Sequence, residues 1–287
     1  MRLRGSVVAL VLLLPVTALA ACAPSNNSSS SPSASPSSCE TSQLPLLKSG
    51  TLTVGTDTPA YEPWFSNNDP SNGKGYESAV AYAVAKQLGF SHDEVTWVKV
   101  PFNNSYKPGA KNFDFDINQI SITPARAKVV DFSDGYYAAS QAVIALKGDP
   151  AASSSSIADL KGLKLGAQTG TTSLTAIRDV IQPDQAPAVF QNTNAAKQAL
   201  LNHQVDAILA DLPTAFYISA VEIPNSTIVG QFQPETGQQE EFGMLFQKGS
   251  GLVPCVNQAL ATLKSNGTLA ALEKKWLSDV VNVPTLR

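Results

Sequence analysis

The chain has 287 residues, of which 43% are apolar and 15% charged, and its formal net charge is −3. These values are typical of a globular protein and exclude a strongly basic nucleic-acid-binding protein, so we expect no nucleic-acid partner. Three cysteines are too few for a disulfide scaffold, and two histidines leave little room for a histidine-built metal site; we expect neither a metal nor a cofactor. A chain of this length usually folds around two cores.

The first residues have the features of a secretory signal. Two arginines precede an apolar run over residues 7–14, and small residues follow it up to Cys22. The run is shorter than the roughly 20 apolar residues that span a membrane. The Leu-Ala-Ala-Cys sequence that ends at Cys22 resembles a bacterial lipobox. We therefore expect a lipoprotein signal peptide over residues 1–21 and a lipid on Cys22; the alternative is an ordinary secretory signal with a chance cysteine.

A serine-rich segment follows the signal. Nine of the fourteen residues from 25 to 38 are serine, and the others are Asn, Pro and Ala. Such a segment cannot bury a core, so residues 22–43 are predicted to be a flexible tether with a reach of roughly 25 Å. The protein is expected outside the cytoplasm, attached to the cell membrane through the lipid.

Two cysteines remain beyond the lipobox. Outside the cytoplasm a remaining pair is more often bridged than free, so we predict a Cys39–Cys255 disulfide. The alternative is two inert thiols.

The rest of the chain alternates short strand patterns with helical patterns. In the first half, strands are expected at 51–55, 95–100, 113–122 and 141–146, and a helix at 78–88. Turn residues at 148–156 then interrupt the pattern. In the second half, strands are expected at 160–168, 205–210 and 241–247, and helices at 195–201, 256–263 and 269–277. Because residues 160–168 echo residues 47–56, the alternation predicts an α/β fold with two similarly built lobes.

Arg126 stands in an unusual position. The run from Ser121 to Arg126 (SITPAR) ends a strand pattern, and its Thr-Pro pair favours the start of a helix. An arginine in the first turn faces the positive end of the helix dipole, which becomes favourable when an anion binds between them. Its planar fork suits a carboxylate. The alternative is a surface arginine paired with Asp131 or Asp134.

Two further sites follow strand patterns in the second half. Residues 166–173 (GAQTGTTS) combine glycines and hydroxyls that bind an anion or simply cap the next helix. They lack the lysine of a phosphate-binding P-loop. Asp211 ends a strand pattern, where ligands of open α/β sheets bind, and it suits an ammonium group. A helix cap before Pro213 is the equally natural alternative.

The loop after the first strand carries acids and aromatic residues. Asp57 and Tyr61 lie where a ligand is expected, and the Tyr61 ring could stack on it, whereas Trp64 and Phe65 are expected in the core. Together with Arg126 for a carboxylate and Asp211 for an ammonium group, these side chains are complementary to a free α-amino acid.

From about Gly50 to Leu277 the chain resembles bacterial extracellular solute-binding family 3, the polar amino-acid-binding proteins of ABC importers. The segments that carry the resemblance are GTLTVGTD, AYEPW, GYESAVAYAVAKQLG, DFDINQISITPARAKVVDFSDGYY, GLKLGAQTGTTS, VDAILADLP and NGTLAALEKKWL. One departure is the sequence Gly-Tyr-Glu-Ser-Ala at residues 75–79, where family members usually have Gly-Phe-Asp-x-Asp.

The resemblance implies a type II periplasmic-binding-protein fold, with the ligand between two lobes. Two hinge strands would cross between the lobes, near residues 142–146 and 241–244. The expected division is residues 44–143 and 243–287 for lobe 1 and residues 144–242 for lobe 2.

Roles for the ligand's charged groups follow from the same resemblance. Arg126 would bind the ligand carboxylate together with Gly170 and Thr172, which begin a helix in lobe 2. Asp211 would bind the ammonium group. Gln119 and Ser121 would add backbone or hydroxyl contacts.

The side-chain pocket would be formed by Asp57, Tyr61 and Phe102, the last aligned within a residue or two. A buried carboxylate at Asp57 favours a cation or an amide and disfavours glutamate and aspartate. Asn103 and Asn104 could reverse this preference by offering amide donors. The expected ligand is therefore glutamine, asparagine or a basic amino acid.

We expect a monomeric binding protein without catalytic residues, which captures the amino acid by hinge closure and delivers it to a membrane permease. One alternative is a periplasmic dehydratase of the cyclohexadienyl type, with Glu62 or Glu240 as its acid. Another is a ligand-sensing lobe for a receptor, although no second membrane segment or signalling domain is expected before Arg287.

Overall fold

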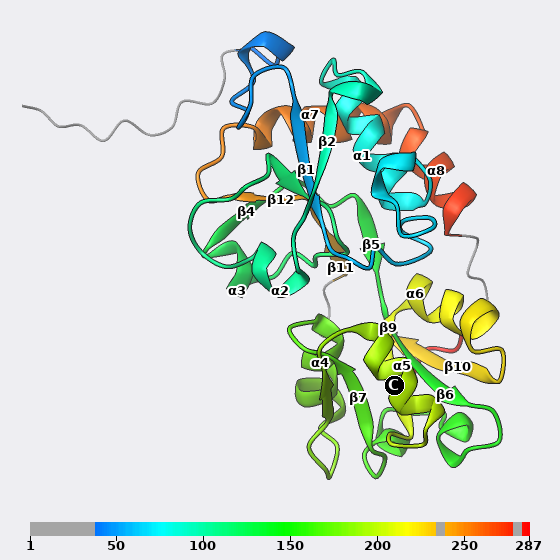
Figure 1. Ribbon diagram of the computed structural model, residues 1–287. Coiled ribbons are helices and arrows are strands. Elements are labelled where there is room, and N and C mark those ends of the chain that lie inside the picture. The colour runs from blue at the N-terminus through cyan, green and yellow to red at the C-terminus, as the bar shows by residue number, and fades with distance from the viewer. Residues whose placement is uncertain (1–37, 234–238, 278–282) are drawn as a thin grey trace, which may run out of the picture. The chain divides into compact units, whose positions relative to one another are not determined.

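The computed structural model describes residues 38–233, 239–277 and 283–287, all within one compact unit, Ser33–Arg287 (Figure 1). The predicted signal peptide over residues 1–21, the lipid on Cys22 and most of the predicted tether lie outside the described residues. Across the three described ranges, every helix is too short or too polar to cross a membrane.

A first sheet of five strands has the order β2-β1-β3-β12-β4. Its strands are β1 (Leu52–Thr56), β2 (Val95–Lys99), β3 (Phe115–Asp116), β4 (Val130–Phe132) and β12 (Leu245–Gln247). The first three run parallel, and β12 is antiparallel to both β3 and β4. We refer to this sheet and the helices packed on it as the first lobe.

Helices cover both faces of the first sheet. One face buries a core against α1 (Tyr76–Gln87), α7 (Val253–Ser265) and α8 (Thr268–Trp276), which lie together in Figure 1. The other face packs against Phe102 of α2 (Phe102–Ser105), and the short helix α3 (Pro124–Ala127) precedes β4. Trp64 and Phe65 are fully buried in the first core, which confirms the expectation from the sequence.

A second sheet of five strands has the order β10-β6-β9-β7-β8. Its strands are β6 (Gln141–Leu146), β7 (Leu165–Gln168), β8 (Ala188–Phe190), β9 (Ala207–Asp211) and β10 (Ser226–Phe232). One face packs on α4 (Thr172–Ala176), and the other on α5 (Thr193–Leu201) and α6 (Leu212–Tyr217). All six residues of β6 are buried, because helices cover both faces of this central strand. This sheet and its helices form the second lobe.

Short helical turns connect these elements. They are the 3₁₀ turns η1 (Thr41–Gln43), η2 (Pro70–Asn72), η3 (His92–Glu94), η4 (Pro150–Ser153) and η5 (Ala158–Leu160), and the π turns η6 (Ile177–Ile181) and η7 (Ile218–Glu222). The two π turns continue α4 and α6 directly.

A two-stranded antiparallel ribbon links the lobes. It pairs β5 (Tyr137–Ala139) with β11 (Glu240–Phe242), and β6 follows β5 after one residue. The expected crossing at residues 142–146 is therefore wrong by several residues: those residues pair with β9 and β10 inside the second sheet. The other expected crossing, at residues 241–244, overlaps β11.

The predicted disulfide is confirmed. Cys39 and Cys255 are joined, with their Cα atoms 5.4 Å apart. The bridge connects the segment just before η1 to the first turn of α7, so the end of the predicted tether is fixed to the first lobe.

The last described residues, 283–287, lie on the second lobe. Thr285 bridges to Gln231 of β10, and Leu286 is buried over Gly230, where an added Cβ would come within 2.5 Å of the leucine side chain. The expected division of the chain stays a prediction, but strand pairing differs from it here and at β6, which begins in the second sheet at Gln141.

The strand expected over residues 113–122 is short in the structure, with only Phe115 and Asp116 in β3. Before it, the Asp114 carboxylate accepts hydrogen bonds from the backbone amides of Leu47 and Thr53. After it, Gln119 has a φ of 46°, which no strand accommodates. Alternation of residue types therefore continued past the point where the strand ends.

Candidate functional site

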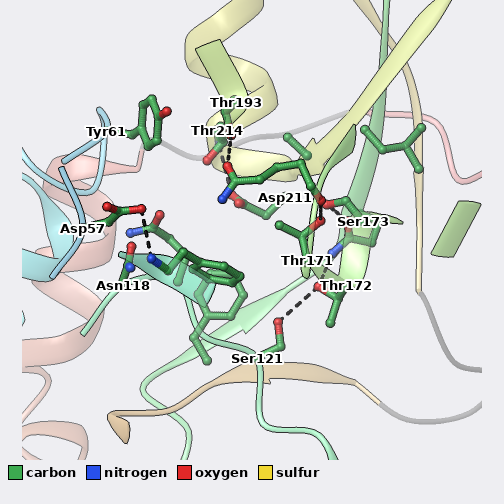
Figure 2. Close-up of a pocket in the computed structure, with 17 residues that line it drawn as sticks. Asp57, Tyr61, Asn118, Ser121, Thr171, Thr172, Ser173, Thr193, Asp211 and Thr214 are labelled. Carbon is green, nitrogen blue, oxygen red and sulfur yellow. Dashed lines mark hydrogen bonds between the residues drawn. The ribbon is translucent and has the colours of Figure 1, made fainter. Parts of the chain in front are cut away.

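A pocket lies where the two sheets approach one another, and residues of both lobes line it (Figure 2). Seven of the nine predicted ligand-binding residues line this pocket: Asp57, Tyr61, Phe102, Gln119, Ser121, Thr172 and Asp211. The other two, Arg126 and Gly170, line a neighbouring cavity that shares Ser121, Thr171 and Thr172 with the pocket. The Ser121 and Thr172 hydroxyl oxygens are 3.2 Å apart, and both residues line both cavities.

Asp57 follows β1 and is fixed by backbone donors. Its carboxylate accepts hydrogen bonds from the amide of Thr58 at 2.6 Å and from the amide of Phe102 at 3.1 Å. The second bond ties the end of β1 to the start of α2, so Asp57 and Phe102 are held together at the pocket wall.

Tyr61 lines the pocket, and its side chain is half-buried. Burial raises the pKa of its hydroxyl, so the group is neutral at physiological pH. The Lys197 ammonium group lies 5.8 Å from the centre of the ring, and it pairs with Glu222 at 2.7 Å. The charge of Lys197 is therefore already matched by a carboxylate of the second lobe.

Asp211 ends β9 and caps α6, accepting a hydrogen bond from the amide of Thr214 at 3.2 Å. Burial raises the pKa of its carboxyl to about 6, although the hydrogen bonds of Thr214 oppose the shift. The helix cap weighed in the sequence is confirmed, yet the same side chain lines the pocket. The cap leaves carboxylate lone pairs for a ligand, so the two uses are compatible.

Arg126 is buried and bonded to two carbonyl oxygens. Its Nη1 donates to the Ser121 oxygen at 2.7 Å and its Nη2 to the Gly170 oxygen at 2.9 Å. The guanidinium carbon lies 4.8 Å from the centre of the Tyr106 ring, and burial lowers the pKa of the group. A surface pairing with Asp131 is wrong, because Asp131 pairs with Lys248 at 2.8 Å.

The start of α4 contains the residues of the second lobe that were predicted to bind the ligand carboxylate. Thr171 caps the helix by accepting from the amide of Leu174 at 3.2 Å, which confirms a capping use of this hydroxyl-rich run. Gly170 has a φ of 75°, and an added Cβ would meet the Asn103 side-chain oxygen at 2.0 Å. The positive φ favours glycine there, and any side chain would also displace the Asn103 and Tyr106 side chains.

Asn103 and Asn104 do not line the pocket. The Asn103 side-chain oxygen accepts a hydrogen bond from the Tyr106 hydroxyl at 2.5 Å, beside Gly170. The idea that these two amides offer donors to the ligand side chain therefore finds no support in their position.

Several residues that line the pocket were not identified from the sequence. Gln141 opens a strand that is otherwise apolar, and a polar residue there was an available hint. It donates to Glu240 at 2.8 Å and accepts from the Ser173 hydroxyl at 2.6 Å. Glu240 also accepts from Ser121 at 2.5 Å. This buried network connects the ribbon, the first lobe and α4. Other lining residues missed include Asn118, Thr193 and Thr214.

Asp116 lies fully buried on β3, behind the pocket, and neither of its carboxylate oxygens has a hydrogen-bond partner. Burial, reinforced by the nearby charges of Glu77 and Asp57, raises the pKa of this carboxyl well above its usual range. The folded protein therefore holds a proton here that the unfolded chain releases near pH 4.

We expect Asp116→Asn to stabilise the protein by about 1–3 kcal/mol at neutral pH. A raised pKa in the folded state means that the wild type loses stability as the pH rises above about 4, and an amide has no such loss. Melting temperatures measured at low and neutral pH test this: the two proteins should melt alike near pH 4 and diverge above it. Asp93→Asn, at a fully exposed side chain, is the control. A destabilised Asp116→Asn protein at neutral pH would contradict the assignment.

The charged side chains among the described residues that line the pocket are all acidic. Asp57 and Asp211 contribute two carboxylates, and among the described residues that line it none is basic. Within the described ranges, no group of three or more His, Cys, Asp and Glu side chains is arranged to hold a metal ion. The pocket is thus suited to an organic ligand that carries positive or amide groups.

Comparison with known proteins decides the family. The sequence model described as bacterial extracellular solute-binding proteins, family 3, matches residues 52–279. The chain belongs to this family. The resemblance noted in the sequence and the expected type II periplasmic-binding-protein fold with two lobes are both confirmed.

Relatives of this family 3 protein bind amino acids. It is 32% identical to the L-cystine-binding protein TcyA of Bacillus subtilis (strain 168), over 98% of this chain and 100% of TcyA. An ancestral arginine-binding protein bound to glutamine has 32% identity and a TM-score of 0.67, covering 80% of this chain and 99% of that one. The ancestral amino acid-binding protein AncCDT-1, a precursor of cyclohexadienyl dehydratase, has 30% identity and a TM-score of 0.66, covering 79% and 95%.

Proposed function

We propose that this protein binds a polar α-amino acid outside the cytoplasm and delivers it to the permease of an ABC importer. The observation that carries the proposal is the pocket between the two sheets, which offers two carboxylates and no basic residue among its described lining. An amino acid brings an ammonium group to one carboxylate, and a basic or amide side chain suits the other. Relatives that bind cystine, arginine and glutamine support the same class of ligand.

The roles of the individual residues follow from their positions. Asp211 binds the ammonium group, and Asp57 with Tyr61 and Phe102 forms the side-chain pocket. Asp57 disfavours glutamate and aspartate as ligands, because two carboxylates would meet without a cation between them. Glutamine, asparagine and the basic amino acids are the expected ligands, and cystine joins them because it carries two ammonium groups.

The ligand carboxylate binds at Arg126, beside Ser121, Gly170 and Thr172. The guanidinium group is already buried and already bonded to a carbonyl oxygen of each lobe. Exchange of a carbonyl for a carboxylate strengthens the contact without a new desolvation cost for the guanidinium group. Arg126 and Asp211 belong to opposite lobes, so the zwitterion stabilises the closed arrangement. The lobes divide at the β5–β11 ribbon, with residues 283–287 on the second lobe.

We propose binding rather than catalysis, because the two acids considered for a dehydratase are already hydrogen-bonded to other side chains or amides and neither lines the pocket. The Glu62 carboxylate accepts from the Ser66 hydroxyl and the amide of Asn67, outside the pocket lining. Glu240 accepts from Ser121 and Gln141. The lipid anchor on Cys22, the monomeric state and the attachment to the membrane belong to the proposal as well.

A thermal-shift screen of the chain from residue 22 onward tests the proposal. The probes are the twenty amino acids with ornithine, citrulline and cystine. A ligand at a hundredfold excess over its Kd stabilises the folded state by about 2.7 kcal/mol, which raises the melting temperature measurably. We expect shifts from one or more of the basic amino acids, glutamine, asparagine and cystine. A shift from glutamate or aspartate alone would overturn the role of Asp57, and turnover of prephenate or arogenate would replace binding by catalysis.

A further inference from the structure

Glu77 is a buried carboxylate that does not line the pocket yet holds a residue that does. It is the second residue of α1 and has no exposed surface. One carboxylate oxygen accepts a hydrogen bond from the backbone amide of Gln119 at 2.6 Å, and the other accepts from the Gln119 side-chain amide. The Tyr136 hydroxyl donates to the same carboxylate. Two of its three hydrogen bonds therefore fix a single pocket residue.

Gln119 has a conformation that needs such support. Its φ of 46° lies in the left-handed region, which costs energy for a residue with a side chain. The segment around it is anchored at both ends by backbone bonds: the amide of Ile117 donates to Gly55, and the amide of Ile122 donates to Glu241. Between these anchors, Glu77 holds the centre of the segment and so presents Gln119 and Ser121 to the pocket.

The carboxylate of Glu77 is itself held rigidly. The amide of Glu77 donates to the Trp64 carbonyl at 2.9 Å, and Gly75 allows this approach, since a Cβ there would lie 2.5 Å from the same oxygen. On the other side, the Tyr76 hydroxyl donates to the Tyr136 carbonyl at 2.9 Å, which steadies the tyrosine that contacts Glu77. Backbone and side-chain hydrogen bonds thus fix the position of Glu77, and Glu77 in turn fixes the position of Gln119.

We propose that Glu77 is a positioning residue of the ligand pocket: it holds Gln119 in its left-handed conformation and sets ligand affinity without touching the ligand. The proposal rests on the proposed function, because Gln119 must contact a bound amino acid for affinity to respond. No contact between Glu77 and the ligand is needed, since its effect passes through two hydrogen bonds.

The ionisation of Glu77 provides a direct readout. Burial raises the pKa of its carboxyl to about 7, against the opposing effect of the hydrogen bonds from Tyr136 and Gln119. The charged or titratable groups that face it are Tyr76, Tyr136, Asp116 and Asp211, from α1, the approach to β5, β3 and β9. Comparison with a Glu77 variant separates its titration from theirs, because the variant keeps all four.

The test uses Glu77→Gln, with Tyr76→Phe as the matched control, in the chain from residue 22 onward. Tyr76→Phe removes a buried hydrogen bond from the same helix turn but leaves both bonds between Glu77 and Gln119. The backbone amide signal of Gln119 is followed by NMR between about pH 5 and about pH 9 in the ligand-free protein. Dissociation constants for L-arginine, L-glutamine and L-cystine are measured by calorimetry, and melting temperatures accompany each variant.

The Gln119 amide signal of the wild type is expected to titrate with a midpoint near pH 7 and to lose that step in Glu77→Gln. The dissociation constant should rise about tenfold in Glu77→Gln, because a charge-assisted bond to the Gln119 amide becomes a neutral one. The melting temperature at pH 8 should not fall, since the folded pKa lies above the unfolded one and the amide removes the cost of a buried charge. Tyr76→Phe should melt lower with an unchanged dissociation constant. A merely structural role would move stability and affinity together.

A Gln119 amide signal that ignores pH in the wild type would overturn the proposal, as would equal dissociation constants for the wild type and Glu77→Gln. If the wild type binds none of the three probes, the proposed ligand class fails instead, and the hold of Glu77 on Gln119 stands or falls on the amide titration alone.

Discussion

Replacement of Arg126 by alanine is expected to abolish amino-acid binding, with a loss of at least about 3 kcal/mol in binding free energy, or more than about a hundredfold in Kd. No described residue that lines the pocket is basic, so Arg126, in the cavity next to the pocket, is the group that we assign to the ligand carboxylate. The guanidinium group is held ready by the Tyr106 ring and by carbonyl oxygens of both lobes. Calorimetry with the amino acid that gives the largest thermal shift measures the loss.

The fold should survive Arg126→Ala, because the two carbonyl oxygens that lose a donor lie beside open cavities where water replaces it. Arg126→Lys keeps the charge but loses the fork, and it should bind more weakly than the wild type and more tightly than the alanine variant. Lys128→Ala is the control: this exposed side chain lines the same cavity and should leave the Kd unchanged. Retained affinity in a folded Arg126→Ala protein would refute the role of Arg126.

Replacement of Asp211 by asparagine is expected to weaken binding by about a hundredfold, since a buried ammonium group loses its carboxylate. Asparagine caps helices as well as aspartate does, so α6 should keep its start. The ligand-free variant should melt no lower than the wild type near neutral pH. Burial raises the pKa of Asp211 to about 6, above that of the unfolded chain, so ionisation of this group destabilises the folded protein as the pH rises.

The same pKa predicts how wild-type binding depends on pH. An ammonium ligand requires the ionised carboxylate, so affinity should fall by up to about tenfold per unit as the pH drops below about 6. Asp211→Asn should lack this step. Asp93→Asn, at an exposed side chain, serves as the control and should keep it. Wild-type affinity that is unchanged down to about pH 4.5 would contradict an ammonium contact at Asp211.

Local patterns in the sequence predicted much of the fold because they report burial along one element. The mostly apolar run of β6 lies at its expected limits, and the helical run of α7 lies within three residues of its expected limits. The run from residue 113 to 122 was misleading, because strand-like alternation cannot reveal that Asp114 is bonded to two backbone amides or that Gln119 turns left-handed. Those features depend on partners far along the chain.

The candidate site shows the same division. Asp57, Tyr61 and Asp211 were singled out because each follows a strand pattern, and strand ends converge in α/β folds. Glu77 was noted only as part of a family motif whose second acid is missing here, while its bonds to Gln119 join residues 42 apart. Asn103 was one possible donor to the ligand side chain, but the packing of α2 places its side-chain oxygen beside Gly170.

By itself, the sequence determined the α/β class and the carboxylates at the strand ends, because periodicity and capping are local properties of a chain. The family followed from motifs that resemble those of family 3, and the disulfide from the two cysteines left beyond the lipobox. Only the tertiary structure decided which carbonyl oxygens Arg126 holds, which carboxylates are left without partners and which residue fixes Gln119. Hydrogen bonds between residues 40 or more positions apart depend on how the helices and loops pack on the sheets. Burial in that packing then shifts the pKa of carboxyl groups such as Glu77.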